Sequence, residues 1–363
     1  MKQTFFLILL FACQLANAQN KIDKVNKYRA QHETAILKEY FNLLSIPNYA
    51  LDKVNIDKNA LFIEAMLKKR GIQTKLLESN TKGSPKAVYG EVIVPGATQT
   101  IIFYAHYDGQ PVNPAKWHPS IKPYQPVLLD QSIEKSGKII AFPTNGQAFN
   151  PEWRISCRSS SDDKAGVMTI INAYDALVKT GVKLNNNIKF FFEGEEEIGS
   201  LHLAEILEKH KDLLKADLWL IGDGPVHQSG LPMIDFGVRG DVNVDITVYG
   251  PKRPLHSGHY GNWAPNPCLM MSKLLASMKD EDGKVKIKGY YDDVIPFSAS
   301  EKQAFSAIPN VDAQMKKELG INKPEGGGKT LFETFEWPSL NINGIKCADV
   351  EDNASNVITT ESK

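Results

Sequence analysis

The sequence predicts an α/β fold, in which a mostly parallel sheet carries helices on both faces, followed by a smaller α+β domain. Two observations predict this arrangement. Short apolar runs typical of strands alternate with stretches of helical periodicity between residues 88 and 221. After Gly240 the pattern changes, because residues 241–249 (DVNVDITVY) alternate apolar and polar positions as a half-exposed strand does.

The composition is that of an ordinary globular protein. The 363 residues are 42% apolar and 23% charged, which lies outside the disordered and fibrous ranges. A chain of this length is expected to form two domains or one large one. The 42 basic and 42 acidic side chains balance. Because nucleic-acid binding depends on an excess of basic side chains, this balance argues against a nucleic-acid partner.

The first 18 residues (MKQTFFLILLFACQLANA) have the pattern of a secretory signal peptide. A lysine precedes an apolar run at 5–12, and small residues at 16–18 offer a cleavage site. No segment reaches the ~20 apolar residues that a permanent membrane span requires. We therefore expect an exported protein, periplasmic or extracellular, that begins at Gln19 and has no membrane contact. A lipoprotein signal with Cys13 as the lipidated residue is the alternative.

Cleavage of the signal would leave three cysteines, Cys157, Cys268 and Cys347. An odd number with wide spacings matches neither a disulfide framework nor a zinc site built from cysteines. The favoured interpretation is that all three are buried free thiols.

The elements of the first domain can be placed in order. Apolar residues at helical spacing predict a helix from residue 21 to Pro47 and a second one over 57–69. Two strands, at 88–94 and 100–104, flank a turn at Pro95-Gly96. The remaining elements are a helix at 164–179, a strand at 188–192, a helix at 201–214 and a strand at 218–221.

The second domain is expected to begin at residue 241. The alternating strand at 241–249 is followed by a Pro-rich turn and a helix over 265–278. A flexible loop is expected at 324–330 (PEGGGKT), and the chain contains no internal repeats. We therefore divide the chain into a signal peptide, a first domain at 19–240 and a second at 241–363.

Potential metal ligands follow three of the predicted strands. His106 and Asp108 follow the strand at 100–104. The glutamates of 193–197 (EGEEE) follow the strand at 188–192, and Asp223 follows the strand at 218–221. Because ligands of an open α/β sheet bind beyond the carboxyl ends of its strands, these side chains should converge. The pair Asp162-Asp163, which directly precedes the helix at 164–179, is expected to join them.

One imidazole among several carboxylates is a ligand set that suits Zn²⁺, Mn²⁺ or Co²⁺. Each motif alone is more typical of a helix cap or a solvated acidic surface, and their joint occurrence is what favours a metal site. Crowded carboxylates repel one another unless a cation neutralises them. Two ions about 3.5–4 Å apart could share one carboxylate and activate a water, with another carboxylate as general base.

Four motifs together resemble the carnosinase, aminoacylase and acetylornithine-deacetylase family of co-catalytic zinc metallopeptidases, and its dipeptidase-like branch in particular. The motifs are YAHYDGQPV at 104–112, SSDDKAGV at 160–167, EGEEEIGS at 193–200 and GDGP at 222–225. They follow in the order and approximate spacing of that family. The resemblance implies a zinc-exopeptidase-like catalytic domain at 19–240 and a lid domain for dimerisation at 241–363.

The resemblance also implies a role for each matched residue. Four residues are implied to bind two divalent metal ions, with Zn²⁺ the favoured metal: His106, Asp162, Glu197 and Asp223. Asp162 would bridge both ions, Asp108 would orient the imidazole, and Glu196 would act as general base. His256, in the motif LHSG, would stabilise the developing oxyanion in the active site of the partner subunit. The implied reaction is hydrolysis of an amide bond in a dipeptide or N-acyl amino acid by a homodimer.

The sequence departs from this family in two places. Three serines at 159–161 stand where the family has a glycine before the Asp pair. In addition, residues 337–345 resemble the middle of the lid, and His259 is the last histidine, so the family's C-terminal histidine ligand has no counterpart. We therefore expect both domains to be incomplete. The alternative function is a catalytically incomplete fragment or remnant that binds metal weakly at most.

Overall fold

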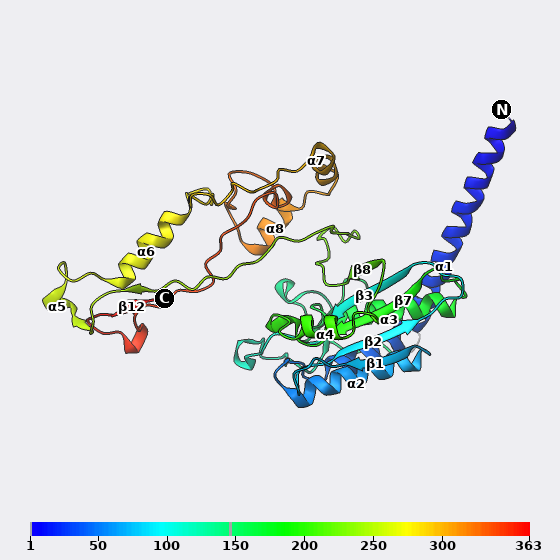
Figure 1. Cartoon of the computed structure of the whole chain (residues 1–363), viewed down its shortest axis with the longest axis horizontal. Coiled ribbons are helices and arrows are strands. Elements are labelled where there is room, and N and C mark those ends of the chain that lie inside the picture. Colours follow the sequence, from blue (N-terminus) through cyan, green and yellow to red (C-terminus); the bar gives the residue numbers. More distant parts are fainter. Residues whose placement is uncertain (1, 145–146) are drawn as a thin grey trace. The chain divides into compact units, whose positions relative to one another are not determined.

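The computed structural model describes residues 2–144 and 147–363, with side chains from residue 21 onward. The chain divides into two compact units, residues 1–225 and 226–363 (Figure 1). The division into a catalytic domain at 19–240 and a lid at 241–363 stays a prediction.

A five-stranded sheet forms the centre of the first unit. Its strands are β1 (Gln73–Leu77), β2 (Ala87–Val92), β3 (Thr100–His106), β7 (Asn187–Glu193) and β8 (Leu218–Ile221), in the order β1-β2-β7-β3-β8. β7, β3 and β8 are parallel neighbours, whereas β2 pairs antiparallel with both β7 and β1. Only β2 therefore opposes the other four strands, and the predicted mostly parallel sheet is confirmed.

Helices cover both faces of this sheet, as expected. They are α1 (Lys2–Leu44), α2 (Lys53–Lys69), α3 (Lys164–Lys179) and α4 (Leu203–Lys209). Residues of α1, α2 and α3 pack with Phe190 and Phe192 of β7 in one buried cluster. Phe191 belongs to a second cluster with Ile206 of α4. Successive side chains of a strand point to opposite faces, so these three phenylalanines anchor both layers.

The predicted helix bounds hold for α3 and need correction for α2 and α4. α2 begins at Lys53, before the predicted residue 57, because the Asp52 carboxylate caps it by accepting the N–H of Asn55 at 3.2 Å. α4 is shorter than the predicted 201–214. The Lys189 ammonium donates to the backbone carbonyls of Leu213 and Lys215, at 2.7 Å each, and so stabilises a non-helical end.

Local pattern did not predict β1 or a small antiparallel sheet between β3 and α3. That sheet has the order β5-β4-β6. Its strands are β4 (Val127–Leu129), β5 (Ile139–Ile140) and β6 (Arg154–Ser156), and the same connection carries the short 3₁₀ helices η1 (Pro114–Lys116) and η2 (Ile133–Lys135). The strands β4, β5 and β6 have only two or three residues each, which is too short to produce a recognisable alternation.

The second unit contains short helices and two antiparallel strand pairs, β10–β11 and β12–β9. Its elements are β9 (Val248–Tyr249), β10 (Leu255–His256), α5 (Ser257–Tyr260), α6 (Pro267–Met278), α7 (Ala299–Ser306), α8 (Asp312–Leu319), α9 (Leu331–Thr334), η4 (Glu351–Asn353), β11 (Val357–Ile358) and β12 (Glu361–Ser362). α6 confirms the predicted helix. The predicted strand at 241–249 was wrong except for its last two residues, because β12 supplies backbone partners to those two alone.

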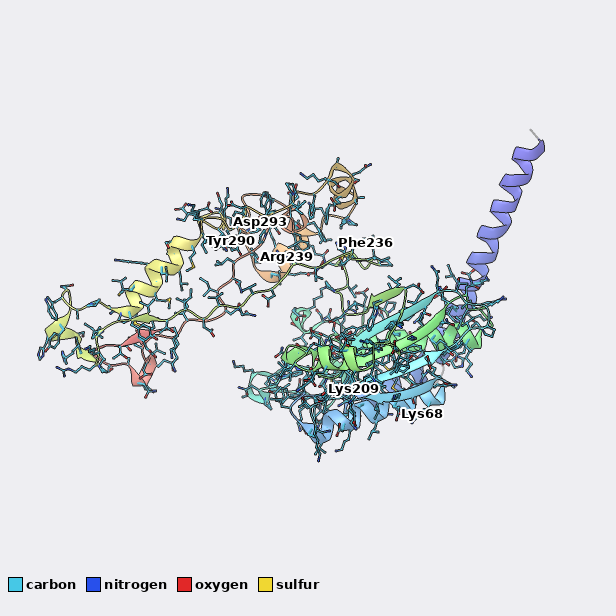
Figure 2. The ribbon with its side chains drawn as sticks, viewed as in Figure 1. Lys68, Lys209, Phe236, Arg239, Tyr290 and Asp293 are labelled. Carbon is cyan, nitrogen blue, oxygen red and sulfur yellow. A yellow bond between two sulfur atoms is a disulfide. The ribbon has the colours of Figure 1, made fainter. Side chains whose placement is uncertain are left out.

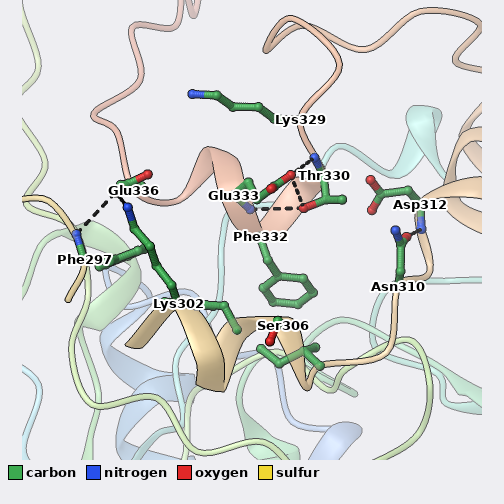
Figure 3. Close-up of a pocket in the computed structure, with 12 residues that line it drawn as sticks. Phe297, Lys302, Ser306, Asn310, Asp312, Lys329, Thr330, Phe332, Glu333 and Glu336 are labelled. Atoms are coloured by element: carbon green, nitrogen blue, oxygen red, sulfur yellow. Dashed lines mark hydrogen bonds and ion pairs between the residues drawn. The ribbon is translucent and has the colours of Figure 1, made fainter. Parts of the chain in front are cut away.

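A cavity of about 390 Å³ lies within the second unit, among residues of α7, α8 and α9 (Figure 3). Phe305 and Phe332 contribute to its lining, and an ion pair of 3.4 Å joins Lys302 to Glu336 at its wall. This cavity contains none of the residues that the sequence predicts as metal ligands or catalytic groups.

Cys268 of α6 and Cys347 form a disulfide, which corrects the expectation of three free thiols. Their Cα atoms are 5.5 Å apart although 79 positions separate them in the chain. Folding brings them together, so sequence spacing alone could not reveal the pairing. Cys157 is free and buried, as expected, with its Sγ atom 3.1 Å from the carbonyl oxygen of Pro123.

α1 begins at Lys2 and therefore includes the predicted signal peptide. Cleavage after residue 18 and export stay predictions. Within the part of the chain that the structure describes, no helix combines the length and apolar character needed to cross a membrane.

Candidate metal centre

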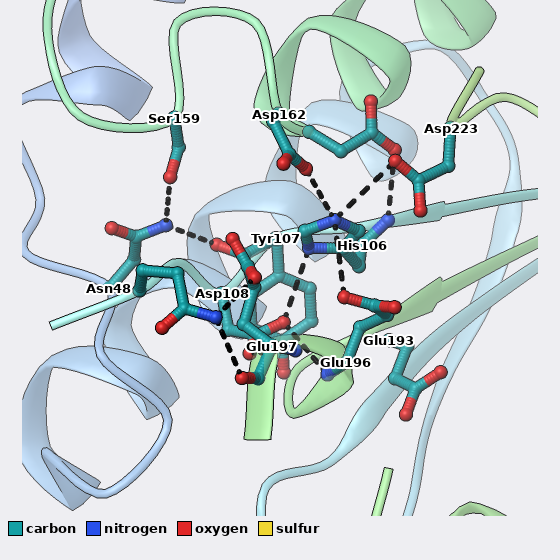
Figure 4. A network of polar contacts seen from close by, with 12 residues as sticks. Asn48, His106, Tyr107, Asp108, Ser159, Asp162, Glu193, Glu196, Glu197 and Asp223 are labelled. Atoms are coloured by element: carbon teal, nitrogen blue, oxygen red, sulfur yellow. Dashed lines mark hydrogen bonds and ion pairs between the residues drawn. The ribbon is translucent and has the colours of Figure 1, made fainter. Parts of the chain in front are cut away.

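His106, at the end of β3, lies among carboxylates from four segments of the chain (Figure 4). Its Nε2 atom is 2.9 Å from Asp162 Oδ1, 3.7 Å from Asp223 Oδ1 and 3.8 Å from Glu196 Oε2. Its Nδ1 atom lies 3.3 Å from Asp108 Oδ1. Because β7, β3 and β8 are parallel neighbours, the residues that follow them meet at one edge of the sheet. The structure thus brings these five side chains together, as the strand-end pattern predicts.

Asp108 connects the imidazole to the turn that carries the glutamates. Its carboxylate is fully buried and accepts the backbone N–H groups of Glu196 and Glu197, at 3.1 Å each. These two residues begin the 3₁₀ helix η3 (Glu196–Ile198). One carboxylate therefore fixes both the His106 ring and the start of this turn.

The two members of the Asp pair have different surroundings. Asp163 is buried, and its oxygens accept the N–H of His106 at 3.2 Å and the N–H of Gly166 at 3.0 Å, which caps α3. The Asp162 side chain is 67% exposed and faces the His106 ring. His106, Asp163 and Asp223 also offer ligand atoms within 4.8 Å of one another. Since hydrogen bonds already engage both Asp163 oxygens, Asp162 is the better ligand candidate.

Glu197 and His256 differ from the other predicted residues in their contacts. Glu197 lies on the turn of the cluster, but its carboxylate accepts a hydrogen bond from Gln110 Nε2 at 2.8 Å. His256 belongs to the second unit and is exposed, and its Nδ1 atom accepts the N–H of Gly258 at 3.1 Å. The implied role of His256 in a partner subunit stays a prediction.

The supporting contacts of two residues, Glu195 and Asn48, were missed by sequence reasoning. The buried Glu195 carboxylate accepts the backbone N–H of His202 at 2.6 Å and lies 2.9 Å from Nδ1 of the same residue. Asn48 donates from Nδ2 to the Tyr107 carbonyl at 2.8 Å and to Ser159 Oγ at 2.9 Å. Glu195 belongs to the acidic run at 193–197, which could have indicated a supporting role. Asn48 lies in the turn after α1, where no sequence pattern predicts a contact with Tyr107 or Ser159.

The carboxylates dominate the electrostatics of the cluster. Burial of His106 opposes its protonation, but Asp108 and Asp223 outweigh this effect and raise the pKa of the imidazole to about 11. Burial, together with the like charge of Asp223, raises the pKa of Asp163 to about 7. Burial also raises the pKa of Glu196. Such an excess of negative charge, combined with one imidazole, fits a divalent cation.

A mostly apolar cavity of about 400 Å³ borders the cluster. Glu196 and Asp223 form part of its wall, so the cavity lies directly beside the residues of the candidate metal centre. The other lining residues are Tyr104, Phe191, Leu203, Leu207, Trp219 and Ile221. A pocket with few polar groups beside charged ones is typical of a binding site for a small organic molecule.

An α/β sheet whose strand ends carry one imidazole and several carboxylates defines a candidate metallohydrolase. The chain belongs to the peptidase family M20/M25/M40, whose family model matches residues 102–338. The resemblance drawn from the four motifs is therefore confirmed.

Among its curated relatives, the chain is similar to a Cys-Gly metallodipeptidase of Candida albicans, with 28% identity over 324 residues. That match covers 87% of this chain and 61% of the relative. It is also similar to the Beta-Ala-His dipeptidase of Homo sapiens, with 29% identity over 286 residues, covering 76% of this chain and 50% of the relative. The chain thus spans 50–61% of the length of these two relatives.

Solved structures share the fold. Human carnosine dipeptidase 1 matches with a TM-score of 0.67 and 22% identity over 94% of this chain and 70% of that chain. An M20 family metallo-carboxypeptidase from Sulfolobus solfataricus matches with a TM-score of 0.66 and 24% identity over 90% of this chain and 69% of that chain.

Proposed function

We propose that this chain carries the metal centre of a dipeptidase that hydrolyses the amide bond of a dipeptide or an N-acyl amino acid. The observation that supports this most is the convergence of four carboxylates on the His106 imidazole in a member of a peptidase family. The dipeptidase names of its relatives support the substrate class.

Four residues would hold two divalent metal ions, for which Zn²⁺ is the favoured identity and Mn²⁺ or Co²⁺ the alternatives. They are His106, Asp162, Glu197 and Asp223. When bound, such ions supply Lewis-acid activation of water and of the peptide carbonyl. Asp162 is suited to be the shared ligand, because its carboxylate is exposed and lies 2.9 Å from the imidazole.

Glu196 would act as the general base. Its carboxylate is 39% exposed and lines the apolar cavity, so a substrate held there could reach it. Glu196 would accept a proton from the attacking water at a carboxylate oxygen and return it to the leaving amine nitrogen. Asp108 would keep the base and the imidazole in a fixed relation through the hydrogen bonds described above.

We further propose an exported homodimer formed through residues 241–363. The signal-peptide pattern of residues 1–18 supports export. His256 of the partner subunit would donate a hydrogen bond to the oxyanion that develops on the substrate carbonyl. The apolar cavity beside Glu196 would receive the substrate side chain next to the scissile bond.

The test is a hydrolysis assay of the purified chain with added Zn²⁺. Cys-Gly, β-Ala-His and Ala-Gly are compared with N-acetyl amino acids at equal concentration. Faster cleavage of the dipeptides supports a dipeptidase, and faster cleavage of the N-acetyl compounds supports a deacylase. Tightly bound zinc without hydrolysis of any substrate would contradict the proposed activity, and weak zinc binding without hydrolysis would favour the catalytically incomplete alternative.

A further inference from the structure

Ser159 has a backbone conformation that favours glycine. Its φ angle is 61°, in the left-handed region, and its side chain is buried. It is the first of the three serines that stand where the family has a glycine before the Asp pair. A strained residue of this kind persists where the surrounding structure compensates for the strain. The contacts of the Ser159 side chain therefore indicate why a serine is present.

The contact that compensates is a hydrogen bond from Asn48. This residue is fully buried, and its Nδ2 atom donates to Ser159 Oγ at 2.9 Å and to the Tyr107 carbonyl at 2.8 Å (Figure 4). Since a carbonyl oxygen can only accept, the contact with Tyr107 turns the amino group of the amide toward Ser159. The serine hydroxyl is thus an acceptor that a glycine at position 159 would lack.

Asn48 also holds the segment that follows β3. Its backbone carbonyl accepts the N–H of Gly109 at 3.0 Å. Together with the bond to the Tyr107 carbonyl, this places one hydrogen bond on each side of Asp108. A Cβ atom at Gly109 would collide with Ser159 Oγ and would lie 3.0 Å from Asn48 Nδ2, so these three residues are closely packed. Asn48 therefore joins the end of β3 to the loop that contains Ser159.

Asp162 lies between two residues that are both attached to the end of α1 or to the turn after it. Ser159, three positions before Asp162, is attached through Asn48. Lys164, two positions after Asp162, is buried, and its ammonium donates to two backbone carbonyls of residues 43–46, at 2.9 Å each. The loop that carries Asp162 and the segment that follows β3 thus have one common anchor.

We propose that Asn48 and Ser159 are positioning residues that set the separation between His106 and Asp162. His106 Nε2 lies 2.9 Å from Asp162 Oδ1. A metal centre functions only when its ligands are held within about 0.5 Å of the productive geometry. The hydrogen bond between Asn48 and Ser159 joins the two segments that carry these ligands. The inference rests on the proposed function, because it concerns two ligands of the proposed metal centre.

The variant Ser159→Gly separates positioning from stability. Glycine relieves the strained φ angle while it removes the hydroxyl, so the variant should melt at the wild-type temperature or above. Its zinc affinity, measured by competition with a chromogenic chelator, should nevertheless fall about tenfold or more, as it does when other supporting contacts of metal ligands are lost. Asn48→Ala should lower the zinc affinity at least as much. The double variant should bind zinc no more weakly than Asn48→Ala, because both substitutions break the same hydrogen bond.

A measurement without metal tests the same positioning independently of zinc binding. In the metal-free chain, labelled with ¹⁵N-histidine, the Nε2 resonance of His106 reports the contact with Asp162. The variant His106→Gln identifies this resonance among those of the other histidines. Ser159→Gly and Asn48→Ala should both shift it, because each loosens the loop that carries Asp162.

Two control variants distinguish positioning from a general loss of structure. Ser161→Ala removes an exposed hydroxyl from the same loop, directly before Asp162. Lys209→Met removes a hydrogen bond of 2.9 Å to the Ser79 carbonyl, which joins two other segments of the first unit (Figure 2). Both variants should keep the wild-type zinc affinity and the wild-type His106 resonance. Lys209→Met should lower the melting temperature, because it removes a hydrogen bond that stabilises the fold.

An unmoved His106 resonance in Ser159→Gly would overturn the proposal, whatever its zinc affinity. Wild-type affinity of Ser159→Gly in a chain that binds zinc would also overturn it, as would equal effects of Ser161→Ala. A shifted resonance in a chain that binds no zinc would support the positioning role and contradict the proposed metal centre. Failure of the inference is therefore distinguishable from failure of the proposed function.

Discussion

The Asp108 carboxylate accepts the backbone N–H of Glu196 at 3.1 Å while it lies 3.3 Å from Nδ1 of His106. A single buried side chain therefore ties the end of β3 to the turn that follows β7. The two strands are parallel neighbours, so their ends already lie close together. Asp108 converts this proximity into a fixed geometry between an imidazole and a carboxylate.

Asp108→Asn should keep the fold and weaken the site. The amide retains one acceptor oxygen but loses the negative charge that faces the imidazole. Loss of such a supporting contact lowers metal affinity or activity by about 10–100-fold. Zinc affinity, measured by competition with a chromogenic chelator, checks this expectation. Unchanged affinity together with unchanged turnover would remove Asp108 from the site.

Glu196→Gln should abolish turnover while bound zinc is retained. A glutamine has the shape of the base but cannot accept the proton, and general-base catalysis contributes about 10²–10⁴-fold. The measurement pairs a dipeptide assay with metal analysis of the same sample. Loss of zinc in this variant would instead assign Glu196 as a ligand.

Substitutions of the two aspartates should affect different properties, metal content for Asp162 and stability for Asp163. Asp162→Ala should lose both metal ions with little change in stability, because its exposed carboxylate is the proposed shared ligand. Asp163→Ala should lower the free energy of unfolding by about 1 kcal/mol or more, because it removes the cap of α3. Metal analysis and thermal denaturation of both variants check this. Retention of zinc in Asp162→Ala and its loss in Asp163→Ala would reverse the assignment.

His256→Ala should reduce turnover and leave the zinc content unchanged. Removal of an oxyanion donor costs about 10²–10³-fold in turnover. His259→Ala is a matched control, since that ring lies on the same segment with its centre 4.7 Å from the centre of the His256 ring. Full activity of His256→Ala would exclude it from the mechanism.

The Cys268–Cys347 disulfide should be present in the natural protein. Disulfides persist in oxidising compartments, so this pairing agrees with the proposed export. Denatured protein should show two additional reactive thiols after reduction, measured by alkylation and mass spectrometry. The Cys347→Ser variant should be less stable by about 2–5 kcal/mol. Equal thiol counts before and after reduction would exclude the disulfide.

The centre of the first unit could be predicted because its signals are local. Residues 218–221 are a short apolar run, and residues 164–179 have clear helical periodicity. The topological rule that parallel strands end at one edge then places His106 beside Asp223 without further information. The orientation of Glu197 toward Gln110 depends on side-chain packing that no pattern encodes.

The features that sequence reasoning missed depend on partners distant in the chain. The disulfide joins residues 79 positions apart. The contact between Asn48 and Ser159 likewise requires the folded chain. In residues 241–247, the alternation is strong, but a strand forms only where a neighbour supplies hydrogen bonds. Local pattern predicts which segments can pair and does not identify their partners.

The most direct test of the central claim is the rate of Cys-Gly hydrolysis by the purified chain after chelation, as Zn²⁺ is added back. We predict no hydrolysis in the metal-free protein and a rate that rises in proportion to the zinc bound. Glu196→Gln should bind the same zinc and remain inactive. Hydrolysis that is indifferent to chelation, or a zinc-loaded chain that cleaves no dipeptide, would contradict the account.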